Sequence, residues 1–181
     1  MSDCLPLQYA LVGYVRNALG EFVENLRREL HPELAHLPAH VSVLPPRPLT
    51  GAEPHALEML ETFCSRVDPF EIEMGDVETF VPTTPTVFIR VAHAGYRLRE
   101  LHDLLNRNGL EFQEPLPYMP HLTIAKVSTV ERAREVFDIS RERWAEYKGP
   151  RRFRLEEVSF VRGRDHQWSD LSSVSLGKVH K

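Results

Sequence analysis

The sequence predicts an α+β fold made of two related halves, roughly residues 1–80 and 81–181. Hydrophobic spacing switches between the two-residue period of strands and the 3.6-residue period of helices. The resulting order is β-α-β-α-β, followed by β-α-β-α-β-β. In each half, one predicted strand begins with a histidine that closely follows a proline. Neither low-complexity sequence nor a flexible linker separates the halves, so we expect one domain over 1–181.

The first half opens with a strand-like mixture of leucine, tyrosine and valine over residues 5–15. Apolar residues then recur at helical spacing over 18–30, with glutamate and arginine between them. Pro38 precedes a short strand over 39–44. We expect this strand to end at the prolines that follow it.

A second helix is predicted to open at Thr50 and Glu53, which have the spacing of a capping box. Its apolar stripe continues to Val67. Two strands follow, over 70–80 and 86–92, and a turn of prolines and threonines joins them.

The second half continues with a helix over 96–108 that is expected to close at Gly109. A proline-rich loop leads into a strand over 121–127. Ser128 and Glu131 then form a second capping-box pattern that predicts another helix.

That last helix is expected to reach at least Phe137, and its pattern also allows an extension to Tyr147. The chain then ends in a predicted hairpin of two strands, 152–162 and 168–176, which turns at 163–165.

The composition is that of an ordinary soluble globular protein, with 42% hydrophobic and 27% charged residues. A formal net charge of −4 argues against coating long duplex nucleic acid, yet it allows a short or terminal nucleotide substrate. No stretch approaches the roughly 20 apolar residues that span a bilayer, so no membrane association is expected. The N-terminus lacks a secretory pattern, and two cysteines, Cys4 and Cys64, make a poor disulfide framework. We therefore expect a cytoplasmic protein and, for want of contrary signals, a monomer.

Two of the nine histidines, His40 and His121, begin the same four-residue pattern of histidine, apolar, hydroxyl, apolar. The first reads His-Val-Ser-Val and the second His-Leu-Thr-Ile. The other seven are expected at helix ends, in loops, in the tail or at the core boundary, as solvated or structural residues: His31, His36, His55, His93, His102, His166 and His180. Duplication sets the first two apart, although a histidine at a strand start can also serve simply to cap it.

Strand geometry gives the pattern a chemical meaning. Side chains alternate between the faces of a strand, so His40 and Ser42 share one face, about 7 Å apart, and His121 and Thr123 do likewise. Two imidazoles held on opposite sides of a phosphorus can act as general base and general acid near neutral pH. The two hydroxyls can donate hydrogen bonds to the non-bridging phosphate oxygens.

Two other classes of protein compete with a phosphodiesterase. A nucleotide-binding module would keep the cleft without meaningful turnover. A histidine-ligated metalloenzyme is disfavoured, because the sequence has no H-E-x-x-H or C-x-x-C motif and no carboxylate beside either histidine pattern. We expect neither a metal nor another cofactor.

The two motifs resemble the signature of the 2H phosphoesterases, in particular their 2′-5′ RNA ligase-like branch. Positions 40 and 121 lie 81 residues apart, close to the family's separation of about 80. Pro120 before the second motif and Ala125-Lys126 after it extend the resemblance. It implies a bilobal fold with two pseudo-symmetric antiparallel sheets, helices outside, a central cleft and strands exchanged between the lobes.

The resemblance also implies the activity and its residues. Members hydrolyse 2′,3′-cyclic phosphates, cleave or join 2′-5′ linkages, or open ADP-ribose 1″,2″-cyclic phosphate. His40 and His121 become the acid–base pair, with their individual roles open, and Ser42 and Thr123 hold the phosphate. Lys126 stands where many relatives carry arginine, but strand parity turns it away from Thr123 unless a bulge intervenes. The implied substrate is a cyclic nucleotide or an RNA terminus.

The sequence departs from the family pattern after the first motif. Serine replaces the commoner threonine at position 42, and the motif leads into Pro45-Pro46-Arg47-Pro48 rather than an aromatic-glycine ending. Arg47 is accordingly a candidate substrate contact or a rim residue. Tyr118 and Phe80 are candidates to stack on a base, with core or rim packing as the alternative.

Overall fold

The computed structural model describes residues 5–92, 95–164 and 167–177. In these residues eight strands form one sheet in the order β6-β3-β4-β5-β2-β1-β7-β8, and every neighbouring pair is antiparallel. The strands are β1 (Gln8–Tyr14), β2 (His40–Arg47), β3 (Phe70–Thr79), β4 (Thr86–Val91), β5 (His121–Lys126), β6 (Arg152–Leu155), β7 (Glu157–Arg164) and β8 (Gln167–Ser175). The helices are α1 (Ala18–Leu30), α2 (Glu53–Cys64), α3 (Gly95–Leu105) and α4 (Val130–Glu146), with single 3-10 turns at η1 (Pro32–Leu34) and η2 (Asn108–Leu110).

The expectation of two separate sheets is wrong, because the two motif strands pair with each other. Val41 of β2 lies opposite Leu122 of β5, and this pairing joins β6-β3-β4-β5 to β2-β1-β7-β8 in one ladder. The sheet is strongly curved. Only Glu156 separates β6, at one edge, from β7, next to the other edge.

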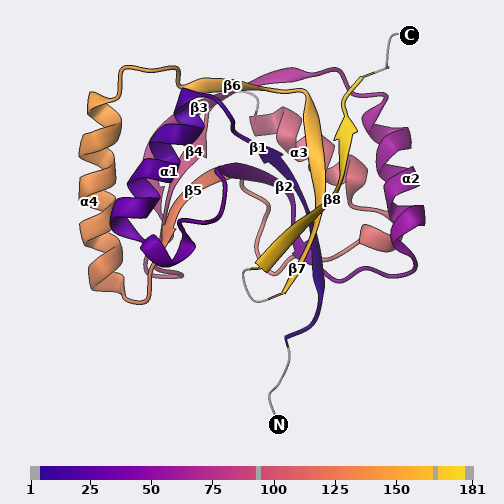
Figure 1. Cartoon of the computed structure of the whole chain (residues 1–181), viewed down its shortest axis with the longest axis horizontal. Helices are drawn as coiled ribbons and strands as arrows, with labels where there is room; N and C mark the ends of the chain where they lie inside the picture. Colours follow the sequence, from indigo (N-terminus) through magenta and orange to yellow (C-terminus); the bar gives the residue numbers. More distant parts are fainter. Residues whose placement is uncertain (1–4, 93–94, 165–166, 178–181) are drawn as a thin grey trace.

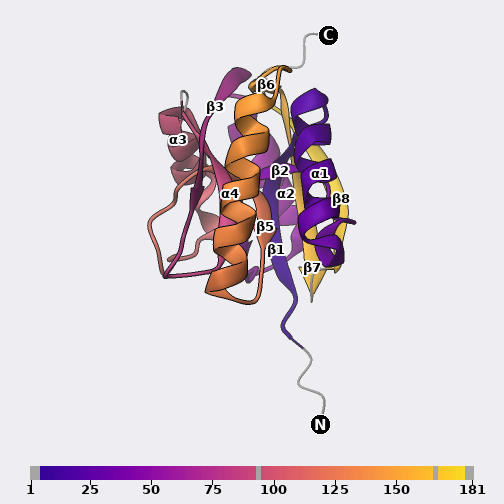
Figure 2. The ribbon, with the colours of Figure 1, turned by 90° about the vertical axis from the view of Figure 1, so that its left-hand side faces the viewer.

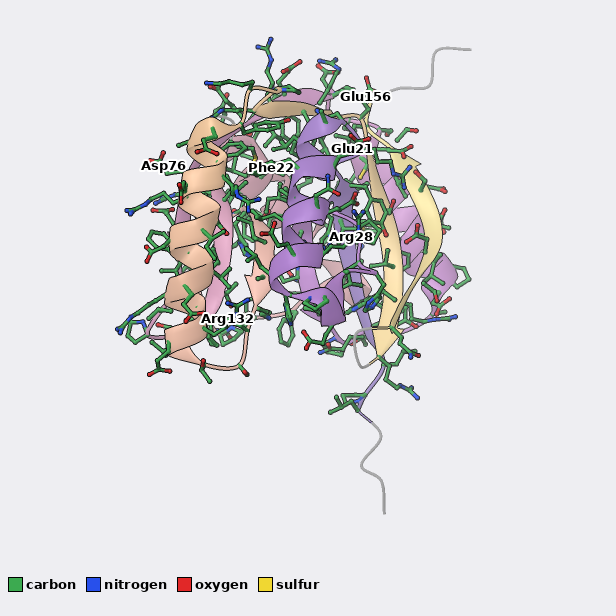
Figure 3. The ribbon with its side chains drawn as sticks, turned by 60° about the vertical axis from the view of Figure 1, so that its left-hand side comes forward. Glu21, Phe22, Arg28, Asp76, Arg132 and Glu156 are labelled. Carbon is green, nitrogen blue, oxygen red and sulfur yellow. The ribbon has the colours of Figure 1, made fainter. Side chains whose placement is uncertain are left out.

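Four helices cover the sheet in two pairs (Figure 1). α1 packs against β5 and α4 against β3, β4 and β5, whereas α3 packs against β2 and α2 against β8. Figure 2 shows α1 and α4 running along the same flank, and an ion pair of 2.9 Å between Arg143 and Glu29 links them. Phe22 of α1, labelled in Figure 3, packs on the rings of Trp144 and Tyr147, at centroid distances of 5.6 and 4.6 Å.

The alternation of strand side chains separates a main core from a smaller cluster. Leu11, Val41 and Leu122 belong to the large core, which also contains the buried faces of the helices. Ala10 and Val12, the alternate residues of β1, belong instead to a small cluster with Val161. That second face of the sheet is the one that carries the motif side chains.

Strand β2 runs to Arg47, although the sequence predicted an end at residue 44. Tyr9 pairs with Arg47 and Leu11 with Leu44, so β2 has one residue more than β1 over this stretch. The extra residue forms a bulge, where proline is tolerated because the ladder already lacks a hydrogen bond.

Helix boundaries depart from the predicted caps by a few residues. Ala52, not Thr50, occupies the N-cap of α2 and makes no side-chain bond there. In α4 the cap is Thr129, one residue after the predicted Ser128, and its hydroxyl accepts from the backbone N–H of Arg132. α4 then extends to Glu146, close to the longer of the two predicted ends, Tyr147.

The end of α3 also differs, since the helix stops at Leu105 and not at residue 108. Asn108, rather than Gly109, takes the left-handed conformation, with φ of 53°. Gly109 is required for steric reasons, because a Cβ atom at this position would lie 2.3 Å from the backbone oxygen of Thr50.

The predicted strand over 152–162 is two strands in different halves of the sheet. β6 pairs with β3, whereas β7 pairs with β1 and β8. The predicted turn at 163–165 includes Asp165, which is outside the described residues. None of the helices in the described ranges has the length and apolar character needed to span a bilayer.

Candidate active site

The four motif side chains lie on two neighbouring strands. Extending the pairing of Val41 with Leu122 by one residue each way places His40 opposite Thr123 and Ser42 opposite His121. Residues opposite each other in this way have Cβ atoms about 5 Å apart. All four side chains are partly exposed, whereas the apolar residues between them are buried.

A β-bulge follows each motif hydroxyl in the same place. Between the pairs Val12–Ser42 and Leu11–Leu44, β2 has one extra residue, Val43. Between Phe88–Thr123 and Val87–Ala125, β5 likewise has one extra residue, Ile124. Each bulge puts two successive buried residues into the core, so the alternation of faces shifts by one position beyond it.

The second bulge changes the expectation for Lys126. Strand parity alone turned this lysine away from Thr123, but the bulge returns it to the motif face, where it is exposed. It lies opposite Thr86 of β4. Its positive charge is also close enough to His121 to disfavour protonation of that imidazole.

Both histidine rings are oriented by the backbone two residues earlier. The Nδ1 atom of His40 lies 2.8 Å from the carbonyl oxygen of Pro38, and that of His121 lies 2.7 Å from the carbonyl oxygen of Met119. Because a carbonyl can only accept, we assign the proton of each neutral ring to Nδ1. The Nε2 atom of each ring is therefore the one left to exchange protons with a substrate.

Enclosure of the two rings lowers their affinity for a proton. Desolvation lowers the pKa of His40 below its ordinary value of 6.5; the Pro38 carbonyl opposes this, and the charges of Arg27 and His121 add to it. Desolvation likewise lowers the pKa of His121; the Met119 carbonyl opposes it, and Lys126 adds to it. Neutral imidazoles are favoured in the free protein at pH 7.

Arg27 of α1 holds the backbone of the second motif, a role that the sequence reading missed. This buried side chain donates from Nη2 to the carbonyl of Thr123 at 2.5 Å and from Nε to that of Ile124 at 3.1 Å. Its third bond, from Nη1 to the carbonyl of Leu37, ties the segment just before the first motif strand to the same group. The signal was present in the sequence, since Arg27 falls on the stripe Val23, Leu26, Leu30 at spacings of three and four.

Tyr118 plays the corresponding part at the first motif. Its hydroxyl donates to the carbonyl of Ser42 at 2.7 Å, and its ring stacks on His102 at a centroid distance of 4.2 Å. One ring face and the hydroxyl are thus engaged within the protein. The packing alternative describes Tyr118 better than stacking on a base.

Arg47 is completely buried, so the structure does not offer it to a substrate. It donates to the carbonyls of Pro45 and Leu110 and to the amide oxygen of Asn106. Its remaining nitrogen lies 3.4 Å from the Glu114 carboxylate. Arg47 therefore anchors the loop after α3 to the end of β2.

Aromatic rings flank both histidines. Phe80 and Phe88 meet the His121 ring edge-on at 5.3 and 5.1 Å. Tyr14 lies 6.4 Å from the His40 ring, and its hydroxyl donates to Asp170 at 2.6 Å. Phe80 is half-buried, so part of its surface remains accessible beside the motif face.

Sequence comparison identifies the family. The model of the 2′-5′ RNA ligase superfamily matches residues 15–167, a range that contains both motifs, both bulges and all four helices. The chain belongs to the 2′-5′ RNA ligase superfamily.

Two bacterial proteins are similar in sequence to this superfamily member. A protein named "Putative phosphoesterase" from Halalkalibacterium halodurans is 26% identical over 121 residues, covering 66% of this chain and 70% of its own. One with the same name from Oceanobacillus iheyensis is 24% identical over 124 residues, with coverages of 66% and 71%.

Solved structures show the same fold at low identity. LigT of E. coli in apo form superposes with a TM-score of 0.60 at 13% identity, covering 96% of this chain and 99% of LigT. Usb1 of Kluyveromyces marxianus gives 0.54 at 12% identity, with coverages of 93% and 98%. Because the identities are so low, these structural similarities establish only the fold of the superfamily member.

Two cavities lie on either side of the motif residues in this 2′-5′ RNA ligase superfamily chain. The first, of about 660 Å³, includes Lys126 at the end of β5. The second, of about 540 Å³, includes Arg90, which lies opposite His121 on β4. Neither lining includes His40, Ser42, His121 or Thr123 themselves.

The other candidate ligands and nucleophiles that the structure describes do not form a second site. Within residues 5–92, 95–164 and 167–177, no three histidine, cysteine or carboxylate side chains are placed to share a metal ion. Cys64 is buried in α2, and burial raises the pKa of its thiol to about 12. Cys4, His93, His166 and His180 are outside the described residues.

Proposed function

We propose that the protein is a metal-independent phosphodiesterase that opens 2′,3′-cyclic phosphate or 2′-5′ phosphodiester bonds of nucleotides or RNA ends. The observation that carries this proposal is the matched pair of histidines. His40 and His121 present Nε2 from one face of adjoining strands, each fixed through Nδ1 by a carbonyl two residues earlier.

The reaction divides between the two imidazoles. The neutral Nε2 of one removes a proton from water, whose oxygen attacks phosphorus. The bond from phosphorus to the 2′ or 3′ ribose oxygen breaks, and the protonated Nε2 of the other histidine donates its proton to that oxygen. One phosphomonoester and one hydroxyl result, and the pair of rings has exchanged protonation states.

The hydroxyls of Ser42 and Thr123 suit the stabilisation of charge in this reaction. By register each lies opposite the histidine of the other motif, so each can donate to a non-bridging oxygen between the rings. Lys126 on the same face adds a positive charge where negative charge accumulates.

Relatives support a nucleotide substrate. The two bacterial proteins of related sequence carry the name phosphoesterase. Crystal structures of E. coli LigT, which shares the fold, have been determined in complex with phosphate and with 3′-AMP. A net charge of −4 fits a short or terminal nucleotide better than a long duplex.

A nucleotide-binding module with little or no turnover is the second candidate. The lowered pKa of both histidines favours it, because the free protein then holds little of the protonated imidazole that must act as acid. An anionic substrate would raise the pKa of the ring that it contacts, which reconciles the same observation with catalysis.

The deciding experiment is hydrolysis of the four nucleoside 2′,3′-cyclic monophosphates with EDTA present. His40→Ala and His121→Ala should each lower kcat by about 10²–10⁴, the usual contribution of a positioned acid or base. His55→Ala, at an exposed position of α2, is the matched control and should keep the wild-type rate. Loss of wild-type activity on chelation contradicts the mechanism, and binding without turnover at any pH supports the module.

A further inference from the structure

The loop between η2 and β5, residues 111–120, contacts both histidine motifs with two consecutive residues. The hydroxyl of Tyr118 donates to the carbonyl of Ser42 in the first motif at 2.7 Å. The next residue, Met119, uses its carbonyl oxygen to fix Nδ1 of His121 in the second motif, also at 2.7 Å. The position of this loop therefore affects one hydroxyl residue and one imidazole of the candidate site at the same time.

The loop has little backbone support of its own. Among the described residues, no backbone–backbone hydrogen bond involves residues 112–119. The middle of this segment projects outward, since Leu116, between two prolines, is 61% exposed. Side-chain contacts therefore hold the loop, and these contacts determine where Tyr118 and Met119 lie.

His102 of α3 contacts both ends of the segment 114–118. Its Nε2 atom lies 2.6 Å from the Glu114 carboxylate, and its ring stacks on Tyr118 with centroids 4.2 Å apart and an interplanar angle of 8°. Its Nδ1 atom lies 2.9 Å from the carboxylate of Asp103, so the imidazolium form can donate to two carboxylates at once. His102 is buried, with 6% of its surface exposed.

We infer that His102 is a positioning residue for both motifs, because it holds residues 114–118 against α3. Tyr118 transmits this position to the first motif, and Met119 transmits it to the second. Both nitrogens and one face of the His102 ring are engaged within the protein, so it acts through the loop and not on a substrate. Only the kinetic consequence of this inference rests on the proposed function.

Glu114 extends the same anchor to the end of β2. Its side chain is 13% exposed, and its carboxylate lies 3.4 Å from the completely buried guanidinium of Arg47. Charge-assisted contacts of this kind are strong and directional where water is largely excluded. β2 is thus connected to His102 at two points, through Arg47 at its end and through Tyr118 at Ser42.

A residue that only stabilised the core would lower stability when replaced and would leave the motif geometry intact. The two roles differ at the imidazoles. Met119, which fixes His121, belongs to the loop, whereas Pro38, which fixes His40, does not. Loss of His102 should therefore disturb one imidazole and spare the other.

The test replaces His102 by leucine and measures ring signals and kinetics. Long-range ¹H–¹⁵N correlation spectra at pH 7 report which nitrogen of each neutral ring carries the proton. In His102→Leu, we expect the His121 signal to move from the Nδ1–H tautomer towards a mixture and the His40 signal to stay in place. The kcat for uridine 2′,3′-cyclic monophosphate should fall by about 10–10²-fold with little change in KM, since the displaced groups act mainly in the transition state.

Two conservative variants separate the two contacts of the ring. His102→Gln keeps a donor for Glu114, and His102→Phe keeps a ring against Tyr118, so each should recover part of the kcat that His102→Leu loses. Leu101→Ala, at the neighbouring buried position of α3, is the control for lost stability alone. It should leave kcat and the His121 signal unchanged.

An unchanged His121 signal in His102→Leu, or an equal loss of kcat in Leu101→Ala, overturns the inference. If His102→Leu does not fold, the same two measurements are made on His102→Gln and His102→Phe, and an unchanged signal in both is then the overturning result. A shifted His121 signal in a protein that hydrolyses no cyclic monophosphate would uphold the positioning role and refute the phosphodiesterase.

Discussion

At the scale of single residues, two backbone carbonyls determine what the histidines can do. Pro38 and Met119 each fix a proton on Nδ1, so the two Nε2 atoms remain for substrate. Desolvation lowers the pKa of both rings, and nearby positive groups add to that effect. The proposed acid–base pair is thus tuned by its surroundings as well as by residue type.

The pH dependence of kcat/KM should be bell-shaped, with its maximum below about pH 6.5. The acidic limb reports the ring that must be neutral and the basic limb the ring that must be protonated. Because both pKa values are lowered, both limbs move to lower pH. Lys126→Gln removes a charge that lowers the pKa of His121, so one limb should move to higher pH. A profile flat from pH 5 to 8 would refute the two-histidine mechanism.

The motif hydroxyls offer a second test at this scale. Thr123→Val and Ser42→Ala should each lower kcat by about 10²–10³, as expected when one donor to the developing charge is lost. Thr123→Ser and Ser42→Thr keep the hydroxyl and should restore most of the rate. Full activity of Thr123→Val in a cyclic-phosphate assay would show that this hydroxyl does not hold phosphate.

At the scale of the elements, each motif strand is held by one polar side chain, the buried Arg27 at the second motif and the half-buried Tyr118 at the first. Arg27 of α1 binds the carbonyls of Thr123 and Ile124, and Tyr118 binds the carbonyl of Ser42. Both groups hold the carbonyl of the motif hydroxyl residue, at or beside a bulge. We interpret them as positioning residues that keep the bulged strands in register.

Tyr118→Phe should lower the free energy of unfolding by about 1–3 kcal/mol, because it leaves the Ser42 carbonyl without this donor. It should also lower kcat without changing the pH profile, since the imidazoles keep their own partners. Tyr147→Phe is the matched control: the Tyr147 hydroxyl is buried and has no hydrogen-bond partner among the described residues, so its removal should not destabilise the protein. Denaturant titrations of both variants measure this difference. An equal loss of stability in the two variants would contradict the role of Tyr118.

At the scale of the whole molecule, the junction of β2 and β5 makes one structure of two similar halves. Val41 and Leu122 pair across it and are both buried in a core that also receives side chains from α1, α2, α3 and α4. The sheet and the core are therefore continuous from one half to the other. The proposed chemistry depends on this junction, because each half contributes one histidine and one hydroxyl.

Leu122→Ala should lower the free energy of unfolding by about 2–5 kcal/mol, through lost burial and the cavity left at the junction. Since the core is continuous, urea unfolding followed by fluorescence and by circular dichroism should still give a single, coincident transition. Leu57→Ala, at a half-buried position of α2, is the comparison and should cost less. Two separate transitions in the wild-type protein would show that the halves unfold independently.

The sequence by itself determined the elements that carry the candidate site. The duplicated pattern at His40 and His121 identified the two motif strands, because alternation along a strand is a local property that the residue types display. The order of helices and strands also followed from local periodicity, and the errors in the elements lay at caps, at the ends of β2 and α3 and at the split at Glu156. These errors arise where a few residues have to satisfy distant partners as well as their own neighbours.

Only the tertiary structure decided how the pieces meet. Pairing of Val41 with Leu122 made one sheet from two, and the bulge at Ile124 returned Lys126 to the face of Thr123. Arg47, a candidate substrate contact, proved wholly buried, and Arg27, which attracted no notice, holds the second motif. These features depend on hydrogen bonds and packing between segments that are far apart in the chain. Local residue preferences cannot predict which distant segments will meet.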